Sequence, residues 1–230
     1  MTKTDFFKIL RISFYSLAGS FLLWALFASL PPLDSWDGYR TIYSRIAVII
    51  TVITLFWTVY FLWLWKLSIF QNLIIRKPCL AGTWIGYVRS DFKKNATQIE
   101  PFKIVFVIHQ TFFSVRINSF TAAYAAHSFG EFFHYASDSK KIRLTYLFAQ
   151  NAVLPHQIDT RQGSAELFYY GHYLAGYYWT IGKTYGFLRV HKLSNETLGS
   201  FEEAEEKYAN NEVINKCYTL IANKQLDYKL

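Results

Sequence analysis

The sequence contains none of the common motifs that carry catalytic chemistry. The GxSxG, HExxH, Walker and GxGxxG patterns are all missing from the chain. Its six histidines are scattered, without a carboxylate and a second ligand at metal-binding spacing on one strand face. We therefore expect that the protein is not an enzyme, and we assign no catalytic residue, metal site or cofactor.

The middle of the chain instead alternates aromatic residues with polar and cationic ones, which is typical of a binding surface. Tyrosine rings stack on nucleobases, and arginine pairs with phosphate. A small anionic nucleotide fits this mixture better than an apolar lipid does, because buried cations are costly beside a lipid. Alternation leaves open which arginine faces a pocket. The candidate ligand-binding residues are Arg116, Ser119, Thr121, Tyr146, Tyr178 and Arg189.

The charge distribution and the cysteine content indicate the kind of partner and the redox compartment that suit this site. Residues 79–193 carry 12 Lys+Arg against 6 Asp+Glu, whereas residues 194–230 carry 4 against 7. A basic middle region favours anionic partners, although a solvated basic surface has the same composition. Cys79 and Cys217 stand alone and suggest neither a disulfide framework nor a zinc site. A reducing compartment is the simpler context.

The elements that must position these residues are strands. Short segments rich in Val, Ile, Tyr, Phe and Thr recur between turn residues from Gly82 onward. They predict eight strands, at 82–90, 102–110, 113–120, 122–136, 142–150, 164–173, 175–181 and 184–192. An even run of antiparallel strands typically closes into an up-and-down barrel, which removes exposed edges; a sandwich is the alternative.

Two similar elements open the first and the seventh predicted strands. Both read Leu-Ala-Gly-x-aromatic, at Leu80–Trp84 and Leu174–Tyr178. A glycine allows a strand to bend, while a large ring two residues later can fill one end of a small barrel. We interpret Gly82, Trp84 and Gly176 as a structural plug of the barrel and not as ligand contacts.

Two uncharged stretches precede the strands. Residues 12–30 and 46–65 contain 19 and 20 residues without a charge, enough to cross a bilayer as helices. A cleaved signal peptide is the alternative for the first stretch, but it is long for one, and Pro31-Pro32 follow in place of a cleavage site. The sequence thus predicts a two-helix transmembrane hairpin.

Lysine and arginine flank this hairpin and indicate its orientation. Lys3, Lys8 and Arg11 precede the first span, and Lys66, Arg76 and Lys77 follow the second. The positive-inside rule then places both termini in the cytoplasm. Residues 66–77 contain no Gly or Pro, so we expect the second helix to continue to Pro78, either as a mechanical link or as an interfacial anchor.

Three regions result: residues 1–78 with the two spans and a basic linker, residues 79–193 with an antiparallel eight-stranded lipocalin-like β-barrel, and residues 194–230 as a C-terminal helical extension. Ser200-Phe-Glu-Glu203 reads as a capping box for a helix that reaches toward Ile221. We expect this helix to pack against the barrel.

The order of these features resembles one family, the two-transmembrane β-barrel effectors of bacterial CBASS antiphage defence (cyclic-oligonucleotide-based signalling), which are STING-like in role. The resemblance covers nearly the whole chain except the C-terminal helix. It rests on two spans, a short basic linker and a series of short motifs: Gly82-x-Trp84-x-Gly86, Ser119-x-Thr121, Leu144-x-Tyr146-x-Phe148, Gly163-x-x-x-Leu167, Leu174-x-Gly176-x-Tyr178 and Gly186-x-x-Arg189. The sequence departs from the family pattern at Arg161-Gln162 and in the aromatic run 129–135.

The resemblance implies a function for each part. The barrel is expected to bind a cyclic dinucleotide made by a partner CD-NTase nucleotidyltransferase. Binding is expected to drive self-association, after which the spans disrupt the inner membrane and the infected cell dies. From the residues themselves, two other hypotheses remain: a membrane-anchored lipocalin-like barrel that binds or senses an apolar small molecule, and a structural anchor that recruits a partner through its aromatic surface.

Overall fold

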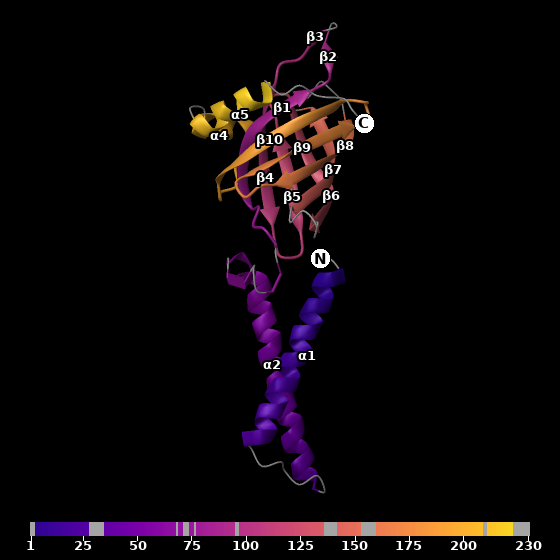
Figure 1. Cartoon of the computed structure of the whole chain (residues 1–230), viewed down its shortest axis with the longest axis vertical. Coiled ribbons are helices and arrows are strands. Elements are labelled where there is room, and N and C mark those ends of the chain that lie inside the picture. Colours follow the sequence, from indigo (N-terminus) through magenta and orange to yellow (C-terminus); the bar gives the residue numbers. More distant parts are fainter. Residues whose placement is uncertain are drawn as a thin grey trace. The chain divides into compact units, whose positions relative to one another are not determined.

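The computed structural model describes residues 3–27, 35–67, 69–70, 74–75, 77–94, 97–135, 142–152, 160–208 and 211–222. The chain divides into two compact units. We call them the helical unit, Met1–Cys79 with Thr111–Phe113, and the barrel unit, Leu80–Gln110 with Ser114–Leu230. Figure 1 labels their elements, and each unit is described by itself below.

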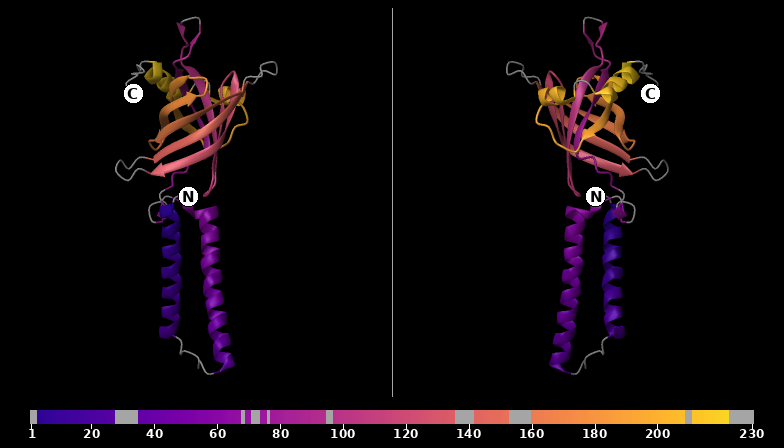
Figure 2. Two further views of the ribbon diagram at one scale, coloured as in Figure 1. Left: turned by 90° about the vertical axis from the view of Figure 1, so that its right-hand side faces the viewer. Right: turned by 90° about the vertical axis from the view of Figure 1, so that its left-hand side faces the viewer.

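The helical unit contains two long antiparallel helices, α1 (Lys3–Phe27) and α2 (Trp36–Leu62) (Figure 2). Both are long and apolar enough to cross a membrane, and almost none of their residues is buried within the structure. Core helices of soluble proteins bury an apolar face, so this exposure favours lipid as their surroundings. The two predicted spans therefore overlap the candidate membrane-spanning helices, Phe6–Trp24 and Trp36–Leu62. Residues 28–30 of the first predicted span lie outside the described residues, and residues 63–65 of the second lie beyond the end of α2.

A cluster of rings packs around the C-terminal end of α2. Trp57, Tyr60 and Trp65 are buried together with Ile75 and Phe112. Phe112 belongs to the helical unit although it lies between two barrel strands in the sequence. Its ring lies 5.6 Å from that of Tyr60 and 6.0 Å from that of Trp65, both edge-on. Aromatic pairs in such geometry stabilise beyond the area they bury.

The predicted continuation of the second helix to Pro78 is wrong. The helix ends at Leu62, and a 3-10 turn, η1 (Leu64–Lys66), follows. Leu67 is extended, with φ −77° and ψ 133°. The turn buries Trp65 against Phe112, and this distant contact outweighs the local helix propensity of the segment. Residues 68, 71–73 and 76 of the predicted linker lie outside the described residues.

The barrel unit confirms the predicted architecture. Its strands close in the order β1-β10-β9-β8-β7-β6-β5-β4, and each strand pairs antiparallel with its neighbours (Figures 1 and 2). The eight barrel strands are β1 (Gly82–Ser90), β4 (Phe102–Gln110), β5 (Val115–Phe120), β6 (Tyr124–Tyr135), β7 (Ile142–Ala152), β8 (Thr160–Tyr169), β9 (Tyr173–Thr180) and β10 (Tyr185–Ser194). A short hairpin of β2 (Lys93–Lys94) and β3 (Thr97–Gln98) lies between β1 and β4 in the sequence and was not predicted.

Alternate residues of each strand fill the barrel interior. The interior core includes Trp84, Phe106, Ile117, Leu167 and Leu174, all essentially inaccessible to solvent. The strand ends divide into two sets because neighbouring strands are antiparallel. We call the set with Leu80, Ile108, Val115 and Val190 the packed end, and the opposite set the cavity end.

Two helices, α4 (Phe201–Tyr208) and α5 (Glu212–Ala222), replace the single predicted C-terminal helix. The predicted capping box is present: the Glu203 N–H donates to Ser200 Oγ, and Glu203 Oε2 accepts from the Gly199 N–H. A second cap at Asn211, whose Oδ1 accepts from the Val213 N–H, starts α5. As expected, these helices pack on the barrel, and α5 contacts β1 and β10.

Candidate ligand-binding cavity

A cavity of about 560 Å³ opens at the cavity end of the barrel. It lies among the ends of β1, β5, β7 and β9 and the starts of β4, β6, β8 and β10. This volume lies within the usual range for small-molecule sites, roughly 300–1,000 Å³. The packed end is filled by core side chains, so the barrel forms a cup open at one end.

The cavity wall is mainly apolar, and its polar part lies nearest the opening. Val88, Ile104, Phe148 and Leu188 form the apolar floor and continue into the core. Polar side chains occur nearer the strand ends, on five of the eight strands and in two of the turns that join strands. They are Ser90, Ser119, Thr121, Gln150, Arg161, Tyr178, Thr180 and Thr184, and Tyr146 adds a phenol lower down.

The two tyrosines predicted as ligand contacts both line the cavity. Tyr146 is almost fully buried, and burial raises its pKa far above the usual value, so the phenol stays protonated and can donate. Burial likewise raises the pKa of Tyr178, against a hydrogen bond with Ser90 that lowers it. Rings held with one face toward a cavity can stack on a planar ligand.

Two inward-facing glycines provide room for aromatic rings. A Cβ on Gly186 would lie 2.4 Å from Tyr178 Cε1, and a Cβ on Gly163 would lie 2.7 Å from Phe148 Cζ. Each glycine pairs across the sheet with the residue whose ring covers it, in the pairs Gly186↔Tyr178 and Gly163↔Phe148. The sequence therefore lays these rings flat against the barrel wall, which keeps the cavity open.

The predicted hydroxyl contacts also line the cavity. Ser119 lies on the same strand face as Val115 and Ile117, which are in the interior core. Thr121 lies at the β5–β6 turn, where its hydroxyl donates to the Tyr124 carbonyl and accepts from the Tyr124 N–H. Ser119 is therefore the more available of the two hydroxyls.

The two predicted arginines lie on the outer face of the barrel and not in the cavity. Arg116 is exposed between Val115 and Ile117, and Arg189 lies between the interior residues Leu188 and Val190. Side chains alternate between the faces of a strand, so an arginine flanked by two core residues must point outward. A ligand in the cavity would not touch either guanidinium.

Arg189 instead belongs to an outer cluster. Its guanidinium carbon lies 4.0 Å from the centre of the Tyr173 ring, and its Nε–H donates to His191 Nε2 at 3.1 Å. Burial, with the charge of Arg189 and with His172, lowers the pKa of His191 to about 4. His191 is therefore neutral at pH 7 and serves as an acceptor.

Arg161 is a cationic cavity residue that was not predicted from the sequence. It lies two residues before Gly163 on β8 and so shares the inward face with Ala165 and Leu167. Its guanidinium lies 5.5 Å from the ring centre of Tyr124, which also lines the cavity. Lys103, the other cationic lining residue, is half-buried and forms an ion pair with Glu205.

Of the predicted plug residues, Gly82 and Trp84 lie at the packed end, whereas Gly176 lies midway along β9 and pairs with Leu188. Trp84 is fully buried, and its Nε1–H donates to the Leu80 carbonyl at 2.8 Å. Gly82 has φ 122°, which favours glycine, beside a register irregularity in β1. A Cβ on Gly176 would lie 1.9 Å from the carbonyl oxygen of Glu166, so β8 and β9 approach too closely for any side chain there.

Neither a search for metal-binding clusters nor a comparison with known proteins identifies a further functional site or a family. Within the described ranges, no group of three or more His, Cys, Asp and Glu side chains is arranged to hold a metal ion. No protein-family model matches the chain, and no curated protein matches it.

Proposed function

We propose that this chain is a CBASS antiphage effector whose barrel binds a cyclic dinucleotide and whose two helices act on the bacterial inner membrane. The observation that carries the proposal is a cup-shaped cavity lined by Tyr146, Tyr178 and Arg161 in a chain that also has two candidate membrane-spanning helices. On this proposal the protein is a receptor with no catalytic step of its own.

The chemistry of the cavity suits such a ligand. Bases can stack on the tyrosine rings and on the apolar floor, while the hydroxyl of Ser119 can bond to a base edge or to ribose. Arg161 at the cavity end can form a charge-assisted bond with one phosphate. Lys93 and Lys183 lie in the segments that follow β1 and join β9 to β10, so they add positive charge beside the opening.

The output requires two states of the protein. A ligand shifts an equilibrium only as far as its affinity differs between the states. We propose a resting state in which the spans are harmless and a ligand-bound, self-associated state in which clustered spans disrupt the bilayer. The basic residues that flank both spans support cytoplasmic termini, where a partner CD-NTase nucleotidyltransferase would release the ligand.

The test uses the full chain in nanodiscs and a complete panel of cyclic dinucleotides, with isothermal titration calorimetry as the readout. We expect saturable binding of at least one member, lost when Ala126, an inward-facing lining residue, is replaced by tryptophan. In cells, replacing both spans by unrelated ones should preserve binding and abolish toxicity. If no member of the panel binds, the proposal is wrong; if toxicity survives the exchange, the spans are only a tether.

A second candidate function is favoured by the apolar floor. Val88, Ile104, Phe148 and Leu188 would suit the hydrocarbon part of a lipid-like ligand, as in a membrane-anchored lipocalin-like carrier or sensor. Native mass spectrometry of the purified full chain distinguishes the two functions. A co-purified lipid that the Ala126→Trp variant loses would support the second function, and a co-purified or added nucleotide would support the first.

A further inference from the structure

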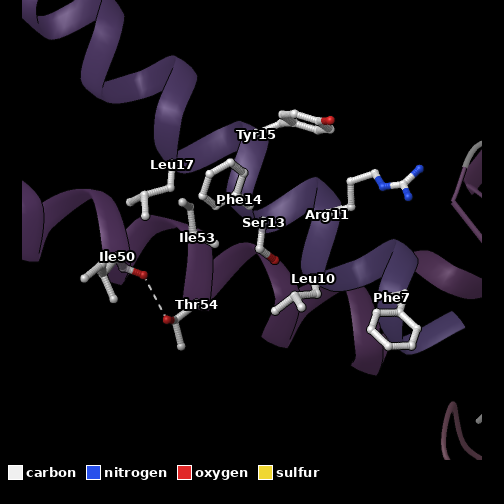
Figure 3. A pocket seen from close by; sticks show the side chains of 10 residues that line it. All are labelled: Phe7, Leu10, Arg11, Ser13, Phe14, Tyr15, Leu17, Ile50, Ile53 and Thr54. Carbon is white, nitrogen blue, oxygen red and sulfur yellow. Dashed lines mark hydrogen bonds between the residues drawn. The ribbon is translucent and has the colours of Figure 1, made fainter. Parts of the chain in front are cut away.

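A groove of about 640 Å³ lies between α1 and α2 within the helical unit (Figure 3). Its wall is apolar, with Phe14 and Leu17 from α1 and Ile50 and Ile53 from α2. Arg11 lines one side of the groove, and in Figure 3 its guanidinium extends away from Leu17 and Ile53. A cation beside an apolar groove between two candidate spans calls for a partner.

The serine and threonine hydroxyls of the groove are already bonded. Ser13 Oγ donates to the Ile9 carbonyl at 2.9 Å and accepts from Trp57 Nε1 at 2.7 Å. Thr54 Oγ1 donates to the Ile50 carbonyl at 2.8 Å. Arg11 is exposed and has no hydrogen-bond or ion-pair partner among the described side chains. The groove therefore offers the Arg11 cation and the Tyr15 phenol, and its other contacts are apolar.

The bond between Ser13 and Trp57 fixes the depth of Arg11 within the hairpin. Leu62, where α2 ends, lies five residues beyond Trp57, or about 7.5 Å along the axis. Arg11 lies two residues beyond Ser13 in the same direction, about 3 Å along α1. The guanidinium thus starts less than one helical turn inside the end of α2, which is close enough for it to reach the headgroup level.

We propose that this groove binds a phospholipid with a net negative headgroup, its phosphate on Arg11 and an acyl chain along Phe14, Leu17, Ile50 and Ile53. Phosphate accepts two parallel bonds from a guanidinium, and anionic lipids are drawn to basic residues at the membrane surface. The inference needs the helices to lie in a bilayer but does not depend on what the barrel binds.

Charge argues for a lipid and against a helix of a second copy in this groove. The apolar stretch of α1 from Phe6 to Trp24 and residues 38–62 of α2 contain no Asp or Glu. A second copy packed along the groove through these stretches would leave Arg11 without an anion in an apolar setting, which is costly. A phospholipid supplies both an anion for Arg11 and hydrocarbon for the apolar wall of the groove.

The test is native mass spectrometry of the full chain transferred from nanodiscs of equal phosphatidylglycerol and phosphatidylcholine. We expect one phosphatidylglycerol retained in preference to phosphatidylcholine, about tenfold weaker retention in Arg11→Gln, and an intermediate value in Arg11→Lys, which keeps the charge but not the paired bonds. Arg45→Gln is the matched control, because Arg45 is exposed on α2 and does not line the groove.

Three results would overturn the proposal: equal retention of the two lipids by the natural chain, unchanged retention in Arg11→Gln, or a dimer in lipid-free detergent cross-linked through Leu17→Cys. Helix content by circular dichroism checks that each variant folds. If Arg11→Gln does not fold, Ile53→Trp, which fills the groove and keeps Arg11, must lower retention in its place. Ligand binding by the barrel, measured on the same samples, should be unchanged in every variant.

Discussion

Replacing Arg161 by glutamine should weaken binding of a cyclic dinucleotide far more than replacing Arg116 or Arg189. The structure places Arg161 in the cavity wall and both other arginines on the outer face. Glutamine keeps the polarity of the side chain and part of its length, and it removes the guanidinium with its charge and most of its donors. The comparison therefore isolates the contribution of one guanidinium in the cavity.

The expected magnitude follows from where Arg161 lies. Two unit charges 4 Å apart interact by about 4 kcal/mol at an effective dielectric constant of 20, a value typical near a protein surface. Arg161 is half-buried at an open end, so solvent and desolvation reduce this gain. A charge-assisted hydrogen bond then contributes about 2 kcal/mol net, which corresponds to roughly a 30-fold change in Kd.

The assay is isothermal titration calorimetry on the full chain in nanodiscs at two salt concentrations. Arg161→Gln should raise Kd about 30-fold and reduce the salt dependence of Kd, because one screened charge pair is lost. Arg116→Gln and Arg189→Gln should stay within about twofold, as expected for distant surface charges. A larger loss in either outer variant than in Arg161→Gln would refute the assignment of the cavity as the binding site.

Three further predictions concern stability and coupling. Gly176→Ala should lower the free energy of unfolding by about 3 kcal/mol, because its Cβ would meet the Glu166 carbonyl at 1.9 Å. Gly130→Ala is the control: the nearest atom to its Cβ lies at 3.5 Å, so its thermal unfolding should change little. Stability of the full chain should fall between pH 6.5 and pH 4, because the unfolded state protonates His191 there and the folded state, with its pKa of about 4, does not. His191→Gln should recover about 1–2 kcal/mol of that loss in denaturant titrations at pH 4.5, a value reduced for solvent screening. If the variant and the natural chain lose stability equally as the pH falls, His191 is not the group responsible. Phe112→Ala should lower the melting temperature of the full chain, since removing a buried ring costs about 3–5 kcal/mol. It should also change the Kd of the cavity ligand, because coupling between the cavity and the ring cluster acts in both directions. An unchanged Kd would show that the ring cluster does not respond to the cavity.

The barrel could be predicted because alternation is a local signal. Val115 and Ile117 are apolar and Arg116 between them is polar, and the structure shows the same division between inside and outside. The same rule could have placed the arginines correctly. Leu188 and Val190 flank Arg189 and fix it outside, and Leu167 and Ala165 share the face of Arg161 and fix it inside. The necessary signal was the parity of each arginine relative to its apolar neighbours.

Other features depend on contacts between residues far apart in the sequence. The turn after Leu62 forms because Trp65 packs against Phe112, which lies 47 residues later in the sequence. No local sequence pattern predicts that contact. The room for the Tyr178 ring likewise depends on Gly186 on the neighbouring strand, which follows from register and not from composition. Propensity is a weak prior that tertiary packing overrides in such places.

Strands β4 and β5 give the cavity a covalent route to the helical unit. Ile104 on β4 and Ser119 on β5 line the cavity. Four residues join these strands at the packed end, and three of them, Thr111–Phe113, belong to the helical unit. A ligand that prefers one geometry of the cavity wall must favour one arrangement of these strands. Because Phe112 is buried among the rings at the end of α2, displacement of this hairpin cannot occur without repacking that cluster. If occupancy of the cavity controls the membrane helices, the ring cluster must therefore pack differently in the ligand-free and the ligand-bound protein.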